Sequence, residues 1–334
     1  MKSAQAYDNA RIEEVEQRRT ELDLYNDFER ETLKRVFQEE YSSNLKTYDL
    51  IDHIDHVAAE YGLSDSTTYW ALRKGLHSFA CQHRALINGA VGERRAYNAI
   101  KHAFVEKRVL SNISLEYEGE TVEIDFLVFT EAGAFFIEAK NYARDLTVAE
   151  DGSFKNPEGK PYNSYNIGER MSASKYIVNA IIKERLRDVP EMPFFTVLLN
   201  ASRVASVINH FPLVDLCTLG EISAYIESYA NVRTLSISEI DALERLFISE
   251  AIIAKPMRPE SFDSIASGLD DFIQLIESSM RANSEKAEVL ENRRTYEVGQ
   301  RNRAIGYPNA REIIVCAASL IVGAVGGYVF AKRA

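Results

Sequence analysis

The sequence has few cysteines and no closely spaced pair of them. Its 334 residues include only Cys81, Cys217 and Cys316. No disulfide framework is expected, and a reducing compartment suits the chain better. Basic residues are also outnumbered, since the chain has 39 Lys and Arg but 50 Asp and Glu, which gives a net charge of −11. A protein that coats nucleic acid with positive charge is therefore excluded, and any polyanion must bind at a locally basic or metal-loaded site.

Long apolar runs are lacking until the C-terminal end. The first residues lead into charged sequence, so no secretory signal is expected. Residues 313–330 (IIVCAASLIVGAVGGYVF) carry no charge and are long enough to span a bilayer as a helix. Ser319, Gly323 and Gly327 form a small-residue face that favours close helix pairing and a homo-oligomer. We expect a single-pass C-terminal anchor at the cell membrane with the bulk of the chain in the cytoplasm. A buried helix of a soluble domain is the alternative.

The pattern along the chain predicts four regions. Residues 1–88 are acidic and helical, with helices at 49–61 and 67–87 and a coiled coil as one arrangement. Residues 89–215 alternate between helix and strand, 216–310 form a helical region and connector, and 311–334 form the anchor. Within the second region the expected order is a helix at 92–107, strands at 108–117, 121–130 and 134–140, a polar loop around 152–161, a helix at 167–187 and a strand at 194–199. This order predicts an α/β fold with a three-strand meander at its centre.

The second of these strands carries a carboxylate in an apolar stretch. Strict alternation would turn Ile124, Phe126 and Val128 to one face and Asp125 to the other. A short turn then leads into the next strand, so an antiparallel hairpin would bring Asp125 near Glu138 at one end of the sheet.

The third strand ends in a Glu-x-Lys pattern, formed by Glu138 and Lys140. Two carboxylates at one place repel unless a cation lies between them. Oxygen ligands suit Mg²⁺ or Mn²⁺, which lower the pKa of bound water and neutralise a phosphate. A neighbouring lysine can orient the water or stabilise the oxyanion. The alternative is a solvated strand end with ordinary surface charges.

Three motifs together make the sequence resemble a known family. They are GERR at 92–95, which opens a helix, EID at 123–125 on the second strand, and FIEAKN at 136–141 on the third. They resemble the nuclease-related domain (NERD) family, which looks like a member of the PD-(D/E)xK nuclease superfamily. The resemblance covers residues 89–145, and through the order of elements it extends to 200. It implies a PD-(D/E)xK-like core flanked by the helical regions and the C-terminal transmembrane helix.

The resemblance also implies roles for individual residues. Asp125 and Glu138 would be metal ligands, with the backbone carbonyl of Ala139 as a further one. Lys140 would be the catalytic lysine, and Glu93 an auxiliary acidic residue near the metal. One departure concerns the second helix, where the family has Asn-Pro and then a Gln. Here 156–157 is Asn-Pro, but no Gln follows.

Basic residues on the two helices of this region favour a nucleic-acid partner. Arg94, Arg95 and Lys101 lie on the first helix, and Arg170 and Lys175 on the second. The main hypothesis is a membrane-anchored, metal-dependent nuclease that cuts DNA rather than RNA, in genome defence or repair. One alternative is a scaffold that binds nucleic acid without cutting and oligomerises at the membrane. Another is a hydrolase of a different phosphate compound.

A zinc site is the weaker metal hypothesis. His77 and Cys81 lie one helical turn apart, as do His53 and His56, and His83 lies nearby. No second cysteine is close, so ordinary helical positions are the alternative.

Overall fold

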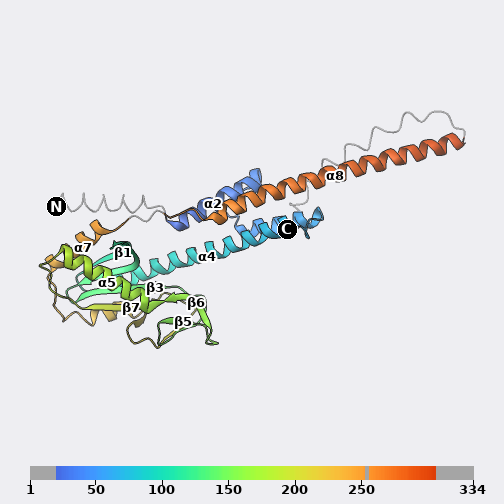
Figure 1. Ribbon diagram of the computed structural model, residues 1–334. Helices are drawn as coiled ribbons and strands as arrows, with labels where there is room; N and C mark the ends of the chain where they lie inside the picture. The colour runs from blue at the N-terminus through green and yellow to red at the C-terminus, as the bar shows by residue number, and fades with distance from the viewer. Residues whose placement is uncertain (1–19, 253–255, 306–334) are drawn as a thin grey trace.

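The computed structural model describes residues 20–252 and 256–305. Figure 1 shows a mixed α/β part and a helical part joined by one long helix, α4 (Thr67–Lys101). Each part has its own apolar core, and the α/β part has one core on each face of its main sheet. The predicted α/β fold with flanking helices is confirmed for the described residues.

The helical part packs around a group of aromatic rings. Phe28 stacks on Phe262 with ring centroids 4.2 Å apart, and Tyr25 stacks on Phe79 at 5.1 Å. Helix ends follow the sequence signals, because the Ser66 hydroxyl accepts a hydrogen bond from the N–H of Tyr69 at the start of α4. The elements are α2 (Glu21–Phe37), the 3₁₀ turn η1 (Gln38–Glu40), α3 (Thr47–Glu60), the first half of α4, and the start of α8 (Glu260–Ile305).

The main sheet has the strand order β1-β2-β3-β7-β9. The first three strands form the predicted antiparallel meander, and β7 and β9 then add in parallel. Helix α5 (Ile167–Arg185) connects the meander to β7, so the predicted order of helix, three strands, helix and strand is confirmed. The strands are β1 (Lys107–Tyr117), β2 (Glu120–Thr130), β3 (Gly133–Lys140), β7 (Phe194–Asn200) and β9 (Asp215–Thr218).

Helices cover both faces of this sheet. Helix α5 and α7 (Ile237–Glu250) pack on one face, where Phe129 stacks on Phe247. The C-terminal half of α4 and α6 (Ile222–Glu227) pack on the other. The sheet is thus buried on both faces, as its nearly continuous apolar strands require.

A second, smaller sheet lies where the sequence predicted only a polar loop. Three of its strands have only three residues, and the longer β6 (Pro161–Asn166) is mostly exposed, so none shows a readable alternation. Left-handed glycines turn the chain between them, Gly152 at φ 82° and Gly159 at φ 75°. That part of the prediction is wrong. The strands, in the order β6-β5-β4-β8, are β4 (Leu146–Val148), β5 (Ser153–Lys155), β6 (Pro161–Asn166) and β8 (Val207–Asn209).

Helix α4 is continuous where two helices were predicted. The expected helices at 67–87 and 92–107 are one, which runs through Gly89 and ends at Lys101. A single glycine costs a helix only about 1 kcal/mol relative to alanine. Burial of Leu76 in the helical core and of Ile100 in the sheet core stabilises the continuous helix by more than this cost.

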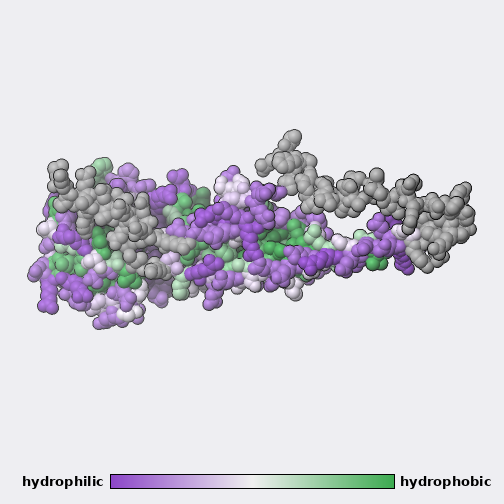
Figure 2. Space-filling view, turned by 90° about the horizontal axis from the view of Figure 1, so that it is seen from above, coloured by the Kyte–Doolittle hydropathy of each residue, from purple (hydrophilic) through white to green (hydrophobic). Residues whose placement is uncertain are grey.

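The far end of α8 projects beyond the helical part. Side chains from Arg281 to Thr295 are all exposed, and the side seen in Figure 2 is mostly hydrophilic. Within residues 20–252 and 256–305, no helix is both long and apolar enough to cross a bilayer. The predicted anchor at 313–330, with its Ser319, Gly323 and Gly327 face, lies outside the described residues.

Two glycines of α4 give a matched test of how this helix packs against the end of β3. An added Cβ at Gly92 would lie 2.6 Å from the Cβ of Asn141, whereas at Gly89 it would meet nothing within 4 Å. Gly92→Ala should therefore lower the free energy of unfolding by about 1–3 kcal/mol. Gly89→Ala should raise it by up to about 1 kcal/mol, because alanine is the better helix former. Urea denaturation of both variants checks this, and equal effects would contradict the close approach of α4 to β3.

Candidate active site

The site lies where β2 and β3 separate. Their pairing runs to Phe126 opposite Ile137 and stops there. The next opposed residues are Asp125 and Glu138, which are only 8% and 2% exposed. Asp125 takes the place of the missing backbone partner, since its Oδ2 accepts a hydrogen bond of 2.9 Å from the N–H of Ala139. The predicted pair of carboxylates is thus brought together inside the protein.

The orientation of Asp125 depends on a local irregularity that the sequence analysis missed. The pairing of β1 with β2 skips one position, between Ser111 opposite Phe126 and Ile113 opposite Ile124. That position joins Asp125 to Asn112, whose φ is 51°, in the left-handed region that Asn tolerates.

The predicted alternation of β2 is therefore wrong at this point. Ile124 belongs to the same core as Leu127 and Phe129, while Phe126 and Val128 belong to the core on the opposite face. A regular strand would keep Ile124 and Phe126 on the same face of the sheet. The strand therefore changes face at Asp125, beside the left-handed Asn112 of β1.

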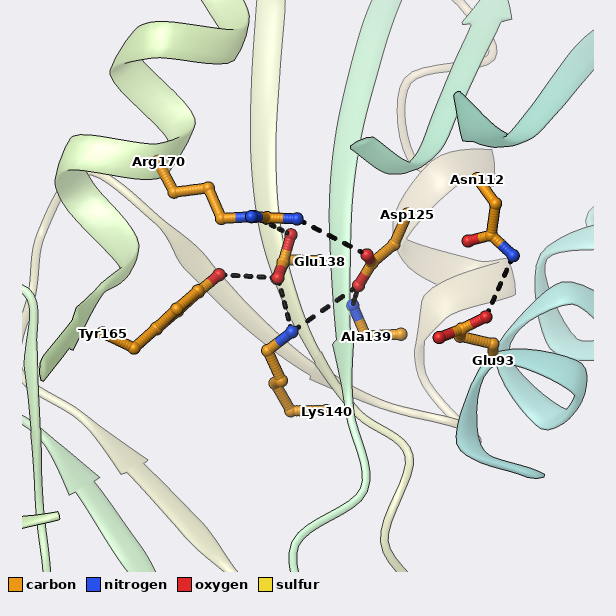
Figure 3. Close-up of polar contacts among 8 residues, drawn as sticks. All are labelled: Glu93, Asn112, Asp125, Glu138, Ala139, Lys140, Tyr165 and Arg170. Carbon is orange, nitrogen blue, oxygen red and sulfur yellow. Dashed lines mark hydrogen bonds and ion pairs between the residues drawn. The ribbon is translucent and has the colours of Figure 1, made fainter. Parts of the chain in front are cut away.

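Two cations neutralise the carboxylates (Figure 3). Lys140 Nζ lies 2.5 Å from Glu138 Oε1 and 3.8 Å from Asp125 Oδ2. Arg170 Nε donates to Glu138 Oε2 at 2.9 Å, and its Nη2 lies 3.9 Å from Asp125 Oδ1. Arg170 was predicted as a phosphate contact, yet it lies within the carboxylate cluster.

Tyr165 completes the cluster and was not predicted. Its hydroxyl donates to Glu138 Oε1 at 2.6 Å, and its ring lies beneath Lys140, 5.1 Å from Nζ. Tyr165 comes from β6, a strand that the sequence analysis did not predict. A tyrosine next to Asn166, the cap of α5, gives no sequence signal for this role.

Burial and charge separate the two acids. Burial, and then the neighbouring Glu138, raise the pKa of Asp125 to about 7. Burial opposes ionisation of Glu138 too, but Lys140 and Arg170 outweigh it and hold the pKa of Glu138 below its usual value. Burial and the Glu138 charge raise the pKa of Tyr165, which keeps its proton for the hydrogen bond. Glu138 is the ionised member of the pair, and Asp125 titrates near neutrality.

The donor atoms fit a hard divalent cation. Asp125 and Glu138 offer carboxylate oxygens, and the buried Oδ1 of Asp125 accepts no hydrogen bond from any described residue. The N–H and C=O of one strand residue point to the same side, so the carbonyl of Ala139 also faces the gap beside Asp125. Within residues 20–252 and 256–305, no three His, Cys, Asp or Glu side chains form a metal-binding group. The two carboxylates and the carbonyl are the oxygen atoms that the structure brings together beside Asp125.

A groove of about 530 Å³ opens beside the cluster. Its walls come from the start of β2, from β6 and from the start of α5. Tyr165 and Arg170 line it and also contact Glu138, so these two side chains connect the groove to the carboxylate cluster. The other lining residues include two acids, Glu123 and Glu169, and otherwise uncharged side chains: Thr121, Val122, Asn163, Ser164, Asn166 and Ala173.

Glu93 lies beside the cluster rather than in it. Its Oε2 accepts a hydrogen bond of 2.9 Å from Asn112, the residue opposite Asp125. In Figure 3 Glu93 lies beyond Asp125, on the side away from Arg170 and Tyr165.

The remaining basic candidates are divided between the two faces of the sheet. Arg94 and Lys101 are exposed and Arg95 half-buried on α4, while Lys175 is half-buried on α5. Because α4 and α5 cover opposite faces, Arg94, Arg95 and Lys101 do not form one patch with Arg170 and Lys175.

The candidate zinc residues do not form a metal site. The Sγ of Cys81 lies 3.7 Å from His77 Nδ1, but His83 is buried against α2, with Nε2 2.8 Å from Asn26 Oδ1. His53 instead packs against the ring of Phe37. Ordinary helix packing accounts for these positions.

The fold and the cluster define a mixed α/β domain with a buried Asp, a Glu-x-Lys motif and a groove beside them. Residues 88–199 match the model of the nuclease-related domain family. This part of the chain is thus a NERD domain, as the sequence motifs indicated. No curated protein and no solved structure matches the chain.

The raised pKa of Asp125 predicts a dependence of stability on pH. Between about pH 4 and pH 7 the folded protein binds this proton more tightly than the unfolded chain, so stability falls as pH rises through that window. Asn at this position cannot ionise and avoids the fall. In EDTA, Asp125→Asn should raise the free energy of unfolding by roughly 1–3 kcal/mol at pH 8, with little effect at pH 4.

Asp145 supplies the control, because its pKa is shifted the other way. The backbone N–H and side chain of Ser206 hold the pKa of Asp145 below its usual value. Asp145→Asn should therefore lower stability at pH 8. Urea denaturation at the two pH values measures both variants, and a loss of stability at pH 8 in Asp125→Asn would contradict the assignment.

Proposed function

We propose that this protein is a metal-dependent nuclease that hydrolyses phosphodiester bonds, in DNA rather than RNA. The observation that carries the proposal is the meeting of Asp125, Glu138 and Lys140 where β2 and β3 separate, inside a nuclease-related domain. A buried pair of acids costs stability, and packing alone would be served better by apolar residues. Chemistry on a substrate explains why the pair is there.

The residues have distinct roles in this proposal. Asp125, Glu138 and the carbonyl of Ala139 hold Mg²⁺ or Mn²⁺. When bound, the ion supplies a water of lowered pKa and neutralises phosphate charge. Lys140, which is 27% exposed, orients the attacking water and stabilises charge on the phosphate oxygens.

Glu93 acts as a positioning residue in this scheme. It holds Asn112, whose left-handed conformation accompanies the turn of Asp125 into the site. Its carboxylate therefore acts through β1 rather than on the substrate.

The groove beside the cluster suits a phosphodiester chain. Its amide and hydroxyl groups at Asn163 and Ser164 can contact phosphate and sugar, and Arg170 can bind a phosphate. Arg94, Arg95, Lys101 and Lys175 supply further phosphate contacts outside the groove.

The second candidate function is a protein that binds nucleic acid without cutting. It is favoured by the closed ion network, in which Lys140, Tyr165 and Arg170 already bind the oxygens of Glu138. A hydrolase of another phosphate compound, such as a nucleotide, would use the same groove. Release of inorganic phosphate from small substrates separates that third function from a nuclease.

The proposed localisation is the cell membrane, where residues 313–330 would anchor the protein. The support is the uncharged run and its flanking basic residues. Oligomers would form through this segment and the helical regions, and genome defence or repair would be the setting.

Removal of the apolar run tests the anchor. Deletion of residues 313–334 should move the protein from the membrane pellet to the supernatant of lysed cells, because the apolar run is lost. Its nuclease activity in vitro should persist. The same distribution with and without this segment would contradict the anchor.

A cleavage assay in detergent tests the nuclease. It compares linear and circular, single- and double-stranded DNA and RNA with Mg²⁺, Mn²⁺ or EDTA. Cutting should require the metal, and Lys140→Ala should reduce its rate by about 10²-fold or more, since one group that stabilises transition-state charge is lost.

Lys74→Ala is the matched control for this assay. It removes the same charge from an exposed position in the helical half of α4 and should leave cutting unchanged. Binding of DNA without metal-dependent cutting by the wild type would shift the assignment to the non-cutting protein.

A further inference from the structure

Arg170 connects the carboxylate pair to the groove. One end of its guanidinium donates to Glu138 Oε2 at 2.9 Å, and the other faces Asp125 Oδ1 at 3.9 Å. Its side chain is 29% exposed and lines the groove. Among the described residues that line this groove, Arg170 is the one cation. A phosphate group that enters would thus meet the guanidinium that binds the two acids.

The acids are already neutralised in this arrangement. Lys140 and Arg170 give the cluster two positive charges against two carboxylates. The Arg170 guanidinium holds Glu138 Oε2 and faces the otherwise unbonded Oδ1 of Asp125, the two oxygens that a divalent cation would need. Such a cation must displace the guanidinium, and it gains less from a neutral cluster than from two uncompensated acids.

Arg170 can leave without disturbing Glu138. The Tyr165 hydroxyl and Lys140 both hold Oε1, the other oxygen of the same carboxylate. Arg170 is the fourth residue of α5, and its side chain stacks on the Tyr165 ring at 5.8 Å, at the groove wall. A guanidinium binds phosphate through two parallel hydrogen bonds, which compete well with its one hydrogen bond to Glu138.

We propose that Arg170 gates the carboxylate pair, closing Asp125 and Glu138 to a divalent cation until a phosphodiester in the groove draws its guanidinium away. The inference rests on the proposed function and adds a way in which that function is regulated. Substrate and metal then bind cooperatively, and the coupling is the same in both directions. The free protein is kept from loading metal and acting without its substrate bound in the groove.

The experiment measures Mn²⁺ binding rather than cutting. Free Mn²⁺ is followed by electron paramagnetic resonance with the full chain in detergent, with and without a cleavage-resistant phosphorothioate DNA oligonucleotide. Without DNA, Arg170→Gln should bind Mn²⁺ about 5–50-fold more tightly than the wild type. DNA should tighten Mn²⁺ binding by the wild type by a similar factor and leave the variant nearly unchanged.

Three further variants make the result specific. Asp125→Asn should abolish the Mn²⁺ binding and so assigns the signal to this site. Lys183→Gln removes the same charge from an exposed position on the same helix and should behave as the wild type. Arg170→Lys keeps the charge without the fork-shaped guanidinium and should give an intermediate affinity, and it replaces Arg170→Gln if that variant does not fold.

Two outcomes would overturn the inference in different ways. Equal Mn²⁺ affinities for the wild type and Arg170→Gln, with and without DNA, would remove the gate and leave the nuclease proposal to the cleavage assay. Absence of Mn²⁺ binding in both proteins, even with DNA present, would remove the gate and the metal-dependent function together.

Discussion

Two acidic side chains buried side by side are the constraint on which the rest of this domain depends. Asp125 and Glu138 can share the gap between β2 and β3 only if cations and donors surround them. One cation, Lys140, comes from β3 itself. The other partners come from the second sheet and the helix that follows it. There Asn166 caps α5 through its side chain and fixes Tyr165 and Arg170 on either side of the cap. The small sheet thus supplies Tyr165, and the helix that follows it supplies Arg170.

Helix α4 places the site relative to the helical part of the molecule. Its first half buries Leu72 and Phe79 in the aromatic core, and its second half buries Ala96 and Ile100 against the sheet. Between them Gly92 lies directly against Asn141, the residue after the Glu-x-Lys motif. Because a helix held at both ends is stiff, the helical part cannot shift without moving the helix that packs behind β3. The long helix therefore serves as the mechanical connection between the two cores.

The sequence was informative where the pattern is local. Long apolar strands, a turn containing Gly133 and a Glu-x-Lys ending were enough to predict the meander and the meeting of Asp125 with Glu138. It was uninformative where position depends on tertiary contacts. The left-handed Asn112 changes the face of two strands, and no composition signal marks it. Strands of three residues carry no readable alternation, and the six-residue β6 is polar and mostly exposed, so the second sheet was missed, and Tyr165 with it. Arg170 was found as a basic residue, but its contact with the acids depends on how α5 meets the sheet.

Arg170, near the start of α5, adds one positive charge to the cluster, donates a hydrogen bond to Glu138 and lies 3.9 Å from Asp125. If the site had lost its function, the acids would be a cost without a benefit, since apolar side chains fill a sheet core more stably than a buried pair of ions. The chain instead surrounds the acids with two cations, a tyrosine hydroxyl and a backbone N–H. Under the proposed function, a cluster so fully partnered on one side and joined to a groove through Tyr165 and Arg170 would be a site whose chemistry is restrained until a substrate arrives.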